Sequence, residues 1–135
     1  MIKIYFSSNA GKNISAEIDL SGNKQDFSEL TKNLNEFLIS ELLQIRIDAD
    51  AKISPFPYAK MLESLIVLKS ENPVLVTVID EKILKVEGSV ECLKAFVSNI
   101  EYVEVGHHIH YEYYDGNEWI LPDSIPLIIS SKSSN

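Results

Sequence analysis

The chain is poor in several residue types on which particular structures depend. Its 135 residues include one cysteine, five glycines, five prolines and one tryptophan. Because Cys92 is alone, no disulfide forms within the chain, and we expect a reducing compartment. No apolar run approaches the roughly 18 residues that indicate a membrane span, and the first ten residues lack the apolar core of a signal peptide. These absences predict a cytoplasmic protein with no membrane partner.

Basic residues are also scarce. Twelve lysines and arginines stand against twenty acidic residues, which gives a net charge of −8. This sign is wrong for holding a phosphate backbone, so the composition argues against a nucleic-acid partner. The same charge speeds the encounter with a basic protein, although acidic surfaces also serve solubility alone.

Common enzyme motifs are missing. The chain has no G-x-S-x-G turn, no glycine-rich phosphate loop, no H-E-x-x-H helix, and no cysteine placed by its spacing beside a histidine. No basic residue adjoins Cys92 closely enough to activate it, which predicts an inert thiol. We therefore predict a protein that is not an enzyme and that uses no cofactor.

What the chain does contain is a set of apolar positions, with one glycine, that recurs at a spacing of 66. The first set is Ile18, Leu20, Gly22, Phe27, Leu30 and Leu34, and it returns as Leu84, Val86, Gly88, Leu93, Phe96 and Ile100. In the same way Leu43, Ile45 and Ile47 return as Ile109, Tyr111 and Tyr113. The recurrence predicts one domain over 1–135 with an internal repeat of 1–70 and 72–131, unless two amphipathic patterns match by chance.

Periodicity predicts the element order β-β-α-β-β in each unit. In the first unit the expected strands are 2–6, 14–20, 43–47 and 64–69, with a helix over 27–38 that Asn23 or Ser21 caps. In the second unit the expected strands are 74–79, 83–86, 107–114 and 126–130, with a helix over 90–103. The turn Ser21-Gly22-Asn23 should stop a strand, Asp80-Glu81 should form a compact turn, and the serine-rich end 130–135 should fray.

Two helices and about eight strands predict an α+β fold. Both helices should pack on one face of an antiparallel or mixed sheet, because each unit alone leaves its apolar face in contact with water.

All three histidines lie in the predicted strand 107–114. Alternate residues of a strand share a face, so His108, His110 and Glu112 should point one way. The spacing of 66 aligns the opposite face with Leu43, Ile45 and Ile47, which we expect to be buried, so the histidine face should point outward. Such a face suits a partner protein, or a surface whose charge changes near pH 6.5.

The same three side chains also suggest an alternative. Neighbours on one strand face have Cα atoms about 7 Å apart, and two imidazoles at that separation can close around a divalent metal. The alternative is therefore a small metal-binding protein, or a metal-dependent enzyme, that uses His108, His110 and Glu112, although the residues themselves favour no bound metal.

A polar loop with the single tryptophan follows the histidine strand. Asp115-Gly116-Asn117 is typical of a turn, and Glu118 and Trp119 come next. A large aromatic ring beside acidic and amide groups is typical of a binding hot spot, but Trp119 could instead cap the core beneath the loop. The candidate partner-binding residues are His108, His110, Glu112, Asp115, Asn117, Glu118 and Trp119.

The segment 107–129, about a sixth of the chain, resembles the C-terminal signature of a family of small bacterial immunity proteins of polymorphic toxin systems. The matching elements are His108 and His110, then Glu112-Tyr113-Tyr114, Gly116, Trp119, and Ser124 with Pro126-Leu127-Ile128. Family members often carry a histidine or proline after the glycine, where this chain has Asn117-Glu118. The resemblance implies a cytoplasmic protein that neutralises a cognate toxin by binding it, and the acidic charge suits a basic toxin.

A third hypothesis is a structural homo-oligomer. The apolar last strand, which begins at Pro126, would then be a sheet edge that pairs with a second copy.

Overall fold

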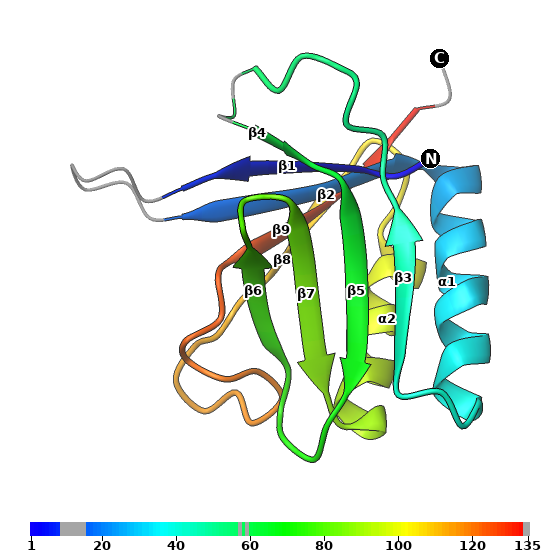
Figure 1. Cartoon of the computed structure of the whole chain (residues 1–135), viewed down its shortest axis with the longest axis vertical. Coiled ribbons are helices and arrows are strands. Elements are labelled where there is room, and N and C mark those ends of the chain that lie inside the picture. Colours follow the sequence, from blue (N-terminus) through cyan, green and yellow to red (C-terminus); the bar gives the residue numbers. More distant parts are fainter. Residues whose placement is uncertain (9–15, 57, 59, 134–135) are drawn as a thin grey trace.

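The computed structural model describes residues 1–8, 16–56, 58 and 60–133, and it divides nine strands between two mixed sheets (Figure 1). Sheet A has the order β4-β1-β2-β9-β8, with β4 (Lys60–Leu62), β1 (Lys3–Ser7), β2 (Glu17–Asn23), β9 (Leu127–Lys132) and β8 (His108–Tyr111). Sheet B has the order β3-β5-β7-β6, with β3 (Gln44–Asp48), β5 (Ser64–Lys69), β7 (Ile83–Gly88) and β6 (Leu75–Ile79). The helices are α1 (Lys24–Ile39) and α2 (Val90–Tyr102). The predicted α+β class with two helices is confirmed, with its strands in two sheets.

Each sheet combines strands from both halves of the chain. Sheet A joins the hairpin β1-β2 to β8 and β9, and sheet B joins the hairpin β6-β7 to β3 and β5. The halves meet where β2 pairs with β9 and where β5 pairs with β7. Among the described strands, these two pairs are parallel and the others are antiparallel. In Figure 1 the strands of sheet B run vertically, while β1 and β2 run across them. The halves therefore interlock instead of lying side by side.

The recurring positions of β2, α1, β7 and α2 form the centre of the core. These twelve are all buried: Ile18, Leu20, Gly22, Phe27, Leu30 and Leu34 in the first half, and Leu84, Val86, Gly88, Leu93, Phe96 and Ile100 in the second. Their side chains belong to one cluster that includes both sheets and both helices. Because α1 and α2 pack against each other as well as against the sheets, the buried stripes of both helices meet within this cluster.

The recurring glycine lies where a strand passes close to another element. A Cβ atom on Gly22 would lie 2.9 Å from the Cβ atom of Asp26 in the first turn of α1. A Cβ atom on Gly88 would lie 3.1 Å from the Cα atom of Val74. At both junctions an added side chain would force its neighbour to move, which is a physical reason for glycine to return at the same place.

Helix capping follows the expected chemistry, with one change in the preceding strand. The Asn23 Oδ1 atom accepts from the Asp26 amide at 2.8 Å, and the Asp26 Oδ2 atom accepts from the Asn23 amide at 2.9 Å, which forms a capping box. Strand β2 runs on through Ser21-Gly22-Asn23, so the prediction that this turn stops the strand is wrong. Parallel pairing with β9 as far as Asn23 and Lys132 continues the strand to the helix cap.

Three further expectations need correction. Leu43 is 70% exposed, because it precedes β3 at the outer edge of sheet B. Ser130 and Ser131, expected to fray, are buried within β9. Strand β9 lies between β2 and β8, so it offers no edge to a second copy.

Ile14, expected near the start of the second strand, lies outside the described residues.

Among the described residues, no helix is both long enough and apolar enough to span a bilayer.

We expect Gly88→Ala to destabilise the fold by about 1–3 kcal/mol, because the new methyl group meets the backbone of Val74 and not only its side chain. Urea unfolding followed by circular dichroism measures this loss. Lys94→Ala, at an exposed position of α2, is the control and should stay within about 0.5 kcal/mol of the parent. An unchanged unfolding midpoint for Gly88→Ala would show that the close approach carries no cost.

Candidate protein-binding site

Strand β8 is an edge strand of sheet A and contains two of the histidines of the predicted histidine face, His108 and His110. His108 and His110 are exposed, and their ring centroids lie 5.4 Å apart. On the other face Tyr111 is buried and meets the Phe96 ring edge-on at a centroid distance of 5.2 Å. The predicted sidedness is therefore confirmed over His108–Tyr111, where the strand is formed.

A turn and a β-bulge set the start of the strand one residue later than predicted. The His107 amide donates to the Glu104 carbonyl at 2.9 Å, with Gly106 at a φ of +85° between them. Ser131 then faces two residues, because its carbonyl accepts from the Gly106 amide at 2.8 Å and its amide donates to the His107 carbonyl at 3.0 Å. This is a G1-type bulge, in which glycine takes the left-handed position, and regular pairing begins at His108.

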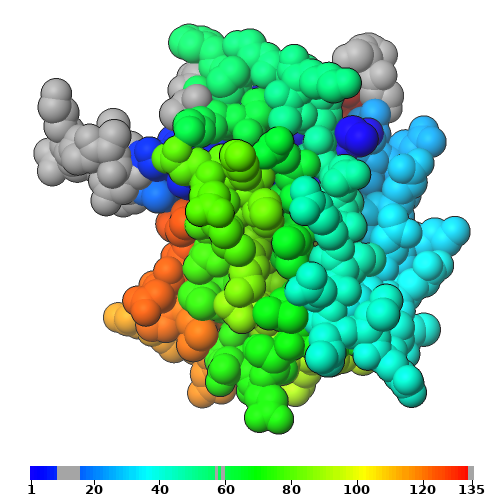
Figure 2. Space-filling view, viewed as in Figure 1, coloured from blue at the N-terminus to red at the C-terminus, as the bar shows by residue number. Residues whose placement is uncertain are grey.

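The loop that follows β8 is fixed by main-chain hydrogen bonds to strand β6 and the residue before it. The Val74 amide donates to the Trp119 carbonyl at 2.8 Å, and the Leu121 amide donates to the Val74 carbonyl at 2.8 Å. The Ser124 hydroxyl accepts from the Val76 amide at 3.0 Å. In Figure 2 the orange part of this loop lies directly against green β6. The loop therefore has a fixed position relative to sheet B.

The tryptophan of this loop is partly exposed. Trp119 is 44% exposed, whereas the adjacent Ile120 is buried and supplies the contact with the core. Ile120 therefore caps the core beneath the loop, and the role of Trp119 in binding stays a prediction. The Asn117 Oδ1 atom accepts from the Trp119 amide at 3.0 Å and orients the turn.

A hollow of about 250 Å³ lies between α2, β8 and this loop. Its lining contains Ala95 and Asn99 of α2, His110 and Tyr111 of β8, and Glu112, Tyr114, Asn117, Trp119 and Ile120 of the loop. Four predicted residues, His110, Glu112, Asn117 and Trp119, are therefore brought together. His108 lies beside His110 outside the lining, and Asp115 and Glu118 are exposed in the loop.

The sequence did not indicate the contribution of α2. Asn99 lines the hollow, and Tyr102 of the next turn is 79% exposed. An exposed aromatic side chain at the end of an amphipathic helix was the available signal, but such a residue alone resembles an ordinary solvent-facing position.

The predicted metal ligands are not gathered. Within the described part of the chain, no group of three or more histidine, cysteine, aspartate and glutamate side chains could hold a metal ion. Strand β8 ends at Tyr111, so the alternation that was to place Glu112 beside the histidines stops one residue too early. The alternative metal site at His108, His110 and Glu112 therefore lacks its geometry.

A half-buried carboxyl group lies on the outer face of sheet A, two strands from β8. The Asp19 Oδ1 atom is buried and has no hydrogen-bond partner among the described residues. Burial raises the pKa of Asp19, while the hydroxyls of Ser130 and Tyr58 and the positive charges of Lys132 and His108 lower it in part. The sequence could not single out Asp19, because its place between Ile18 and Leu20 is that of any outward strand residue.

Two tyrosines adjoin this carboxyl group. Burial, followed by the negative charge of Asp19, raises the pKa of Tyr58 to about 12. The Tyr5 ring packs against the Tyr58 ring at a centroid distance of 5.5 Å, and burial also raises the pKa of Tyr5. Both phenols are thus protonated at neutral pH, and the Tyr58 hydroxyl donates toward the Asp19 carboxyl group.

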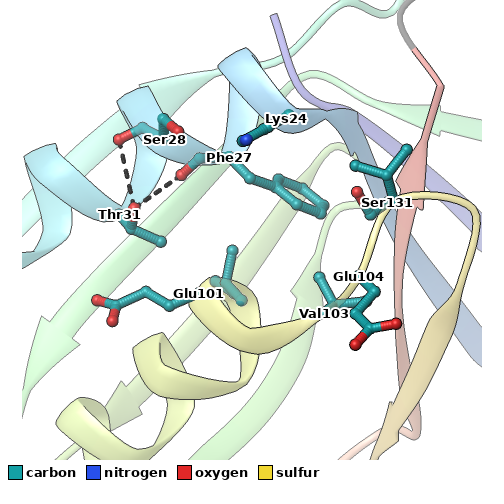
Figure 3. A pocket seen from close by; sticks show the side chains of 10 residues that line it. Lys24, Phe27, Ser28, Thr31, Glu101, Val103, Glu104 and Ser131 are labelled. Carbon is teal, nitrogen blue, oxygen red and sulfur yellow. Dashed lines mark hydrogen bonds between the residues drawn. The ribbon is translucent and has the colours of Figure 1, made fainter.

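A second hollow, of about 430 Å³, lies between α1 and the end of α2 (Figure 3). The Phe27 ring reaches into it from α1 toward Ser131. The Thr31 hydroxyl donates to the Phe27 carbonyl at 2.8 Å, so it is engaged within its own helix. With Glu101 and Glu104 as the acidic members of the lining, this groove shows no nucleophile paired with a base.

No family model, no curated protein and no solved structure matches this chain.

We expect Ser124→Ala to destabilise the protein by about 1–2 kcal/mol, because it leaves the Val76 amide without its acceptor. Thermal unfolding measures this change. The control is Ser98→Ala on α2, whose hydroxyl bonds only within its own helix and should cost less than about 0.5 kcal/mol. Equal effects of the two substitutions would contradict the anchoring role of Ser124.

We expect Asp19→Asn to raise stability at neutral pH relative to the parent. The pKa of Asp19 is higher in the folded state than in the unfolded state, so the parent loses stability as the pH rises from the unfolded pKa through the folded pKa. The gain of Asp19→Asn should therefore be small near pH 3 and grow above about pH 4. Urea unfolding of both proteins from pH 3 to pH 7 checks this, and a difference that does not vary with pH would contradict it.

Proposed function

We propose that this chain is a non-enzymatic binding protein that neutralises a cognate, basic protein toxin by direct contact. The contact surface, called here the β8 surface, consists of His108, His110, Glu112, Tyr114, Asn117 and Trp119. The observation that carries the proposal is the gathering of four of the seven predicted residues around one hollow, at the edge of a sheet.

The two aromatic residues of this surface suit a binding hot spot. Tyr114 is 67% exposed and Trp119 is 44% exposed, yet both lie in a loop that hydrogen bonds fix to sheet B. A ring held on a fixed main chain loses little conformational freedom when a partner covers it. Aromatic area therefore contributes to affinity here without a large cost in ordering.

The charge around the β8 surface supports a basic partner. Residues 90–123, which form α2, β8 and most of the loop, contain seven acidic residues and one basic residue, Lys94. Most of the net negative charge of the chain thus lies in this quarter of the sequence. Long-range attraction raises the association rate of a basic toxin and orients it toward this side.

The test begins with the gene beside that of this chain, which we expect to encode a basic toxin-domain protein, and co-expresses the two proteins. We expect co-expression to restore growth and the purified proteins to form a complex. Trp119→Ala and Tyr114→Ala should each weaken binding by about ten- to hundredfold, measured by calorimetry. Growth arrest despite co-expression would overturn the proposal.

Phe56→Ala is the matched control for these variants. Phe56 is an 84% exposed aromatic residue that precedes β4, at the opposite edge of sheet A from β8. Its removal should leave toxin binding within about twofold of the parent. An equal loss of affinity for Phe56→Ala and Trp119→Ala would show that exposed aromatic residues contribute non-specifically and that the β8 surface is not the binding site.

A further inference from the structure

We propose that β8 accepts an extended, basic segment of the partner as an additional strand of sheet A. The inference rests on the proposed function and names the mode of contact. It comes from the unpaired edge of β8, from the groove between this edge and α2, and from the charge of both.

The main chain of β8 is open on one side. Among the described residues β8 pairs only with β9, and it is the last strand of its sheet. The hydrogen bond from the Ser131 amide to the His107 carbonyl fixes the alternation of the antiparallel ladder. Ile109 and Tyr111 therefore bond to β9, and the amide and carbonyl groups of His108 and His110 point to the open edge.

A groove follows this edge on the side of α2. The hollow of about 250 Å³ between α2, β8 and the loop shares Asn99 with a smaller, neighbouring hollow of about 190 Å³. Ser98, Tyr102 and Ile109 also line this smaller hollow. An added strand would place every second side chain over these hollows, about 7 Å apart, with the intervening side chains on the outer face beside the histidines. The groove thus supplies side-chain contacts for a segment whose main chain bonds to β8.

The two edges of sheet B are less open to pairing. Strand β3 presents Arg46 and Asp48, which form an ion pair with an N–O distance of 3.8 Å at the edge of sheet B. The edge beside β6 is covered by the loop, through the bonds of Val74 and Val76. Fixed charges and covering segments are the usual protections of an edge. Strand β8, with the sequence His-Ile-His-Tyr, has neither along its described length.

The lining of the groove selects a basic segment. Glu112 and His110 both line the hollow, and Lys94 is the only lysine or arginine of 90–123, which carries seven acidic residues. The Glu112 carboxylate and the net negative charge of 90–123 would repel an acidic segment. Lysine or arginine side chains of a basic segment would pair with Glu112 instead.

The test uses a fluorescent, end-blocked hexapeptide of alternating lysine and valine, with the glutamate-valine peptide as its acidic counterpart. The variants are His110→Pro and His110→Val. Both remove the imidazole, but only proline removes the outward amide, and an edge strand tolerates proline where the amide faces solvent. We expect the basic peptide to bind His110→Pro about tenfold more weakly than His110→Val, as measured by fluorescence anisotropy.

A second measurement covers the case in which His110→Pro does not fold, which circular dichroism would reveal. Two versions of the basic peptide are made, one N-methylated at its odd-numbered residues and the other at its even-numbered residues. The affinity of each for the unaltered protein is measured. One version should lose about tenfold in affinity and the other should keep it, because only one set of peptide amides faces β8.

Three results would overturn strand addition: no binding of the basic peptide, equal binding of the acidic and basic peptides, or equal binding by His110→Pro and His110→Val. The proposed function fails separately. A chain that neutralises the toxin but binds neither peptide keeps its function and loses this mode of contact, whereas a chain that binds the basic peptide without neutralising the toxin shows the reverse.

Discussion

The rest of the structure depends on two parallel strand pairings. They join β2 to β9 and β5 to β7, and each connects a hairpin of one half to the last strands of the other half. Paired residues such as Ile18 with Leu127 and Leu65 with Leu84 are fully buried. Since β8 is attached to sheet A through β9 alone, the position of the β8 surface depends on the first of these pairings.

Local features of the fold were predictable, but strand partners were not. The recurring positions of β2, α1, β7 and α2 are buried, Asn23 caps α1, and Asp80 and Glu81 form a turn in the left-handed region. These features follow from periodicity and from short-range chemistry. An alternating pattern predicts which face of a strand is buried, but it does not identify the strand that pairs with it. The exchange of strands between the halves could therefore not be predicted. For the same reason the exposed Leu43 and the inner position of β9 were not predicted.

The candidate site shows the same division. The sequence selected His110, Glu112, Asn117 and Trp119 because they are close together along the chain, and the structure gathers them. It missed Asn99 of α2, and it missed the buried Oδ1 atom of Asp19, which has no partner in the described part of the chain, because contact between distant segments leaves no periodic signal. It also extended the histidine strand too far, since the bulge at Gly106 and the end of β8 depend on pairing with β9.

Open edges are usually a hazard, and this chain treats its edges unequally. The edge beside β6 is covered by the same loop that carries Trp119, and β3 carries charges. The loop therefore closes one edge while it holds exposed aromatic residues beside another, the edge of β8. Because hydrogen bonds fix that loop in the folded chain, the proposed partner would meet a surface that is already ordered, and the cost of organising it would belong to folding and not to binding. Under the proposed function, the groove and the charge beside this unpaired edge would select one kind of strand from those that an open edge can pair with.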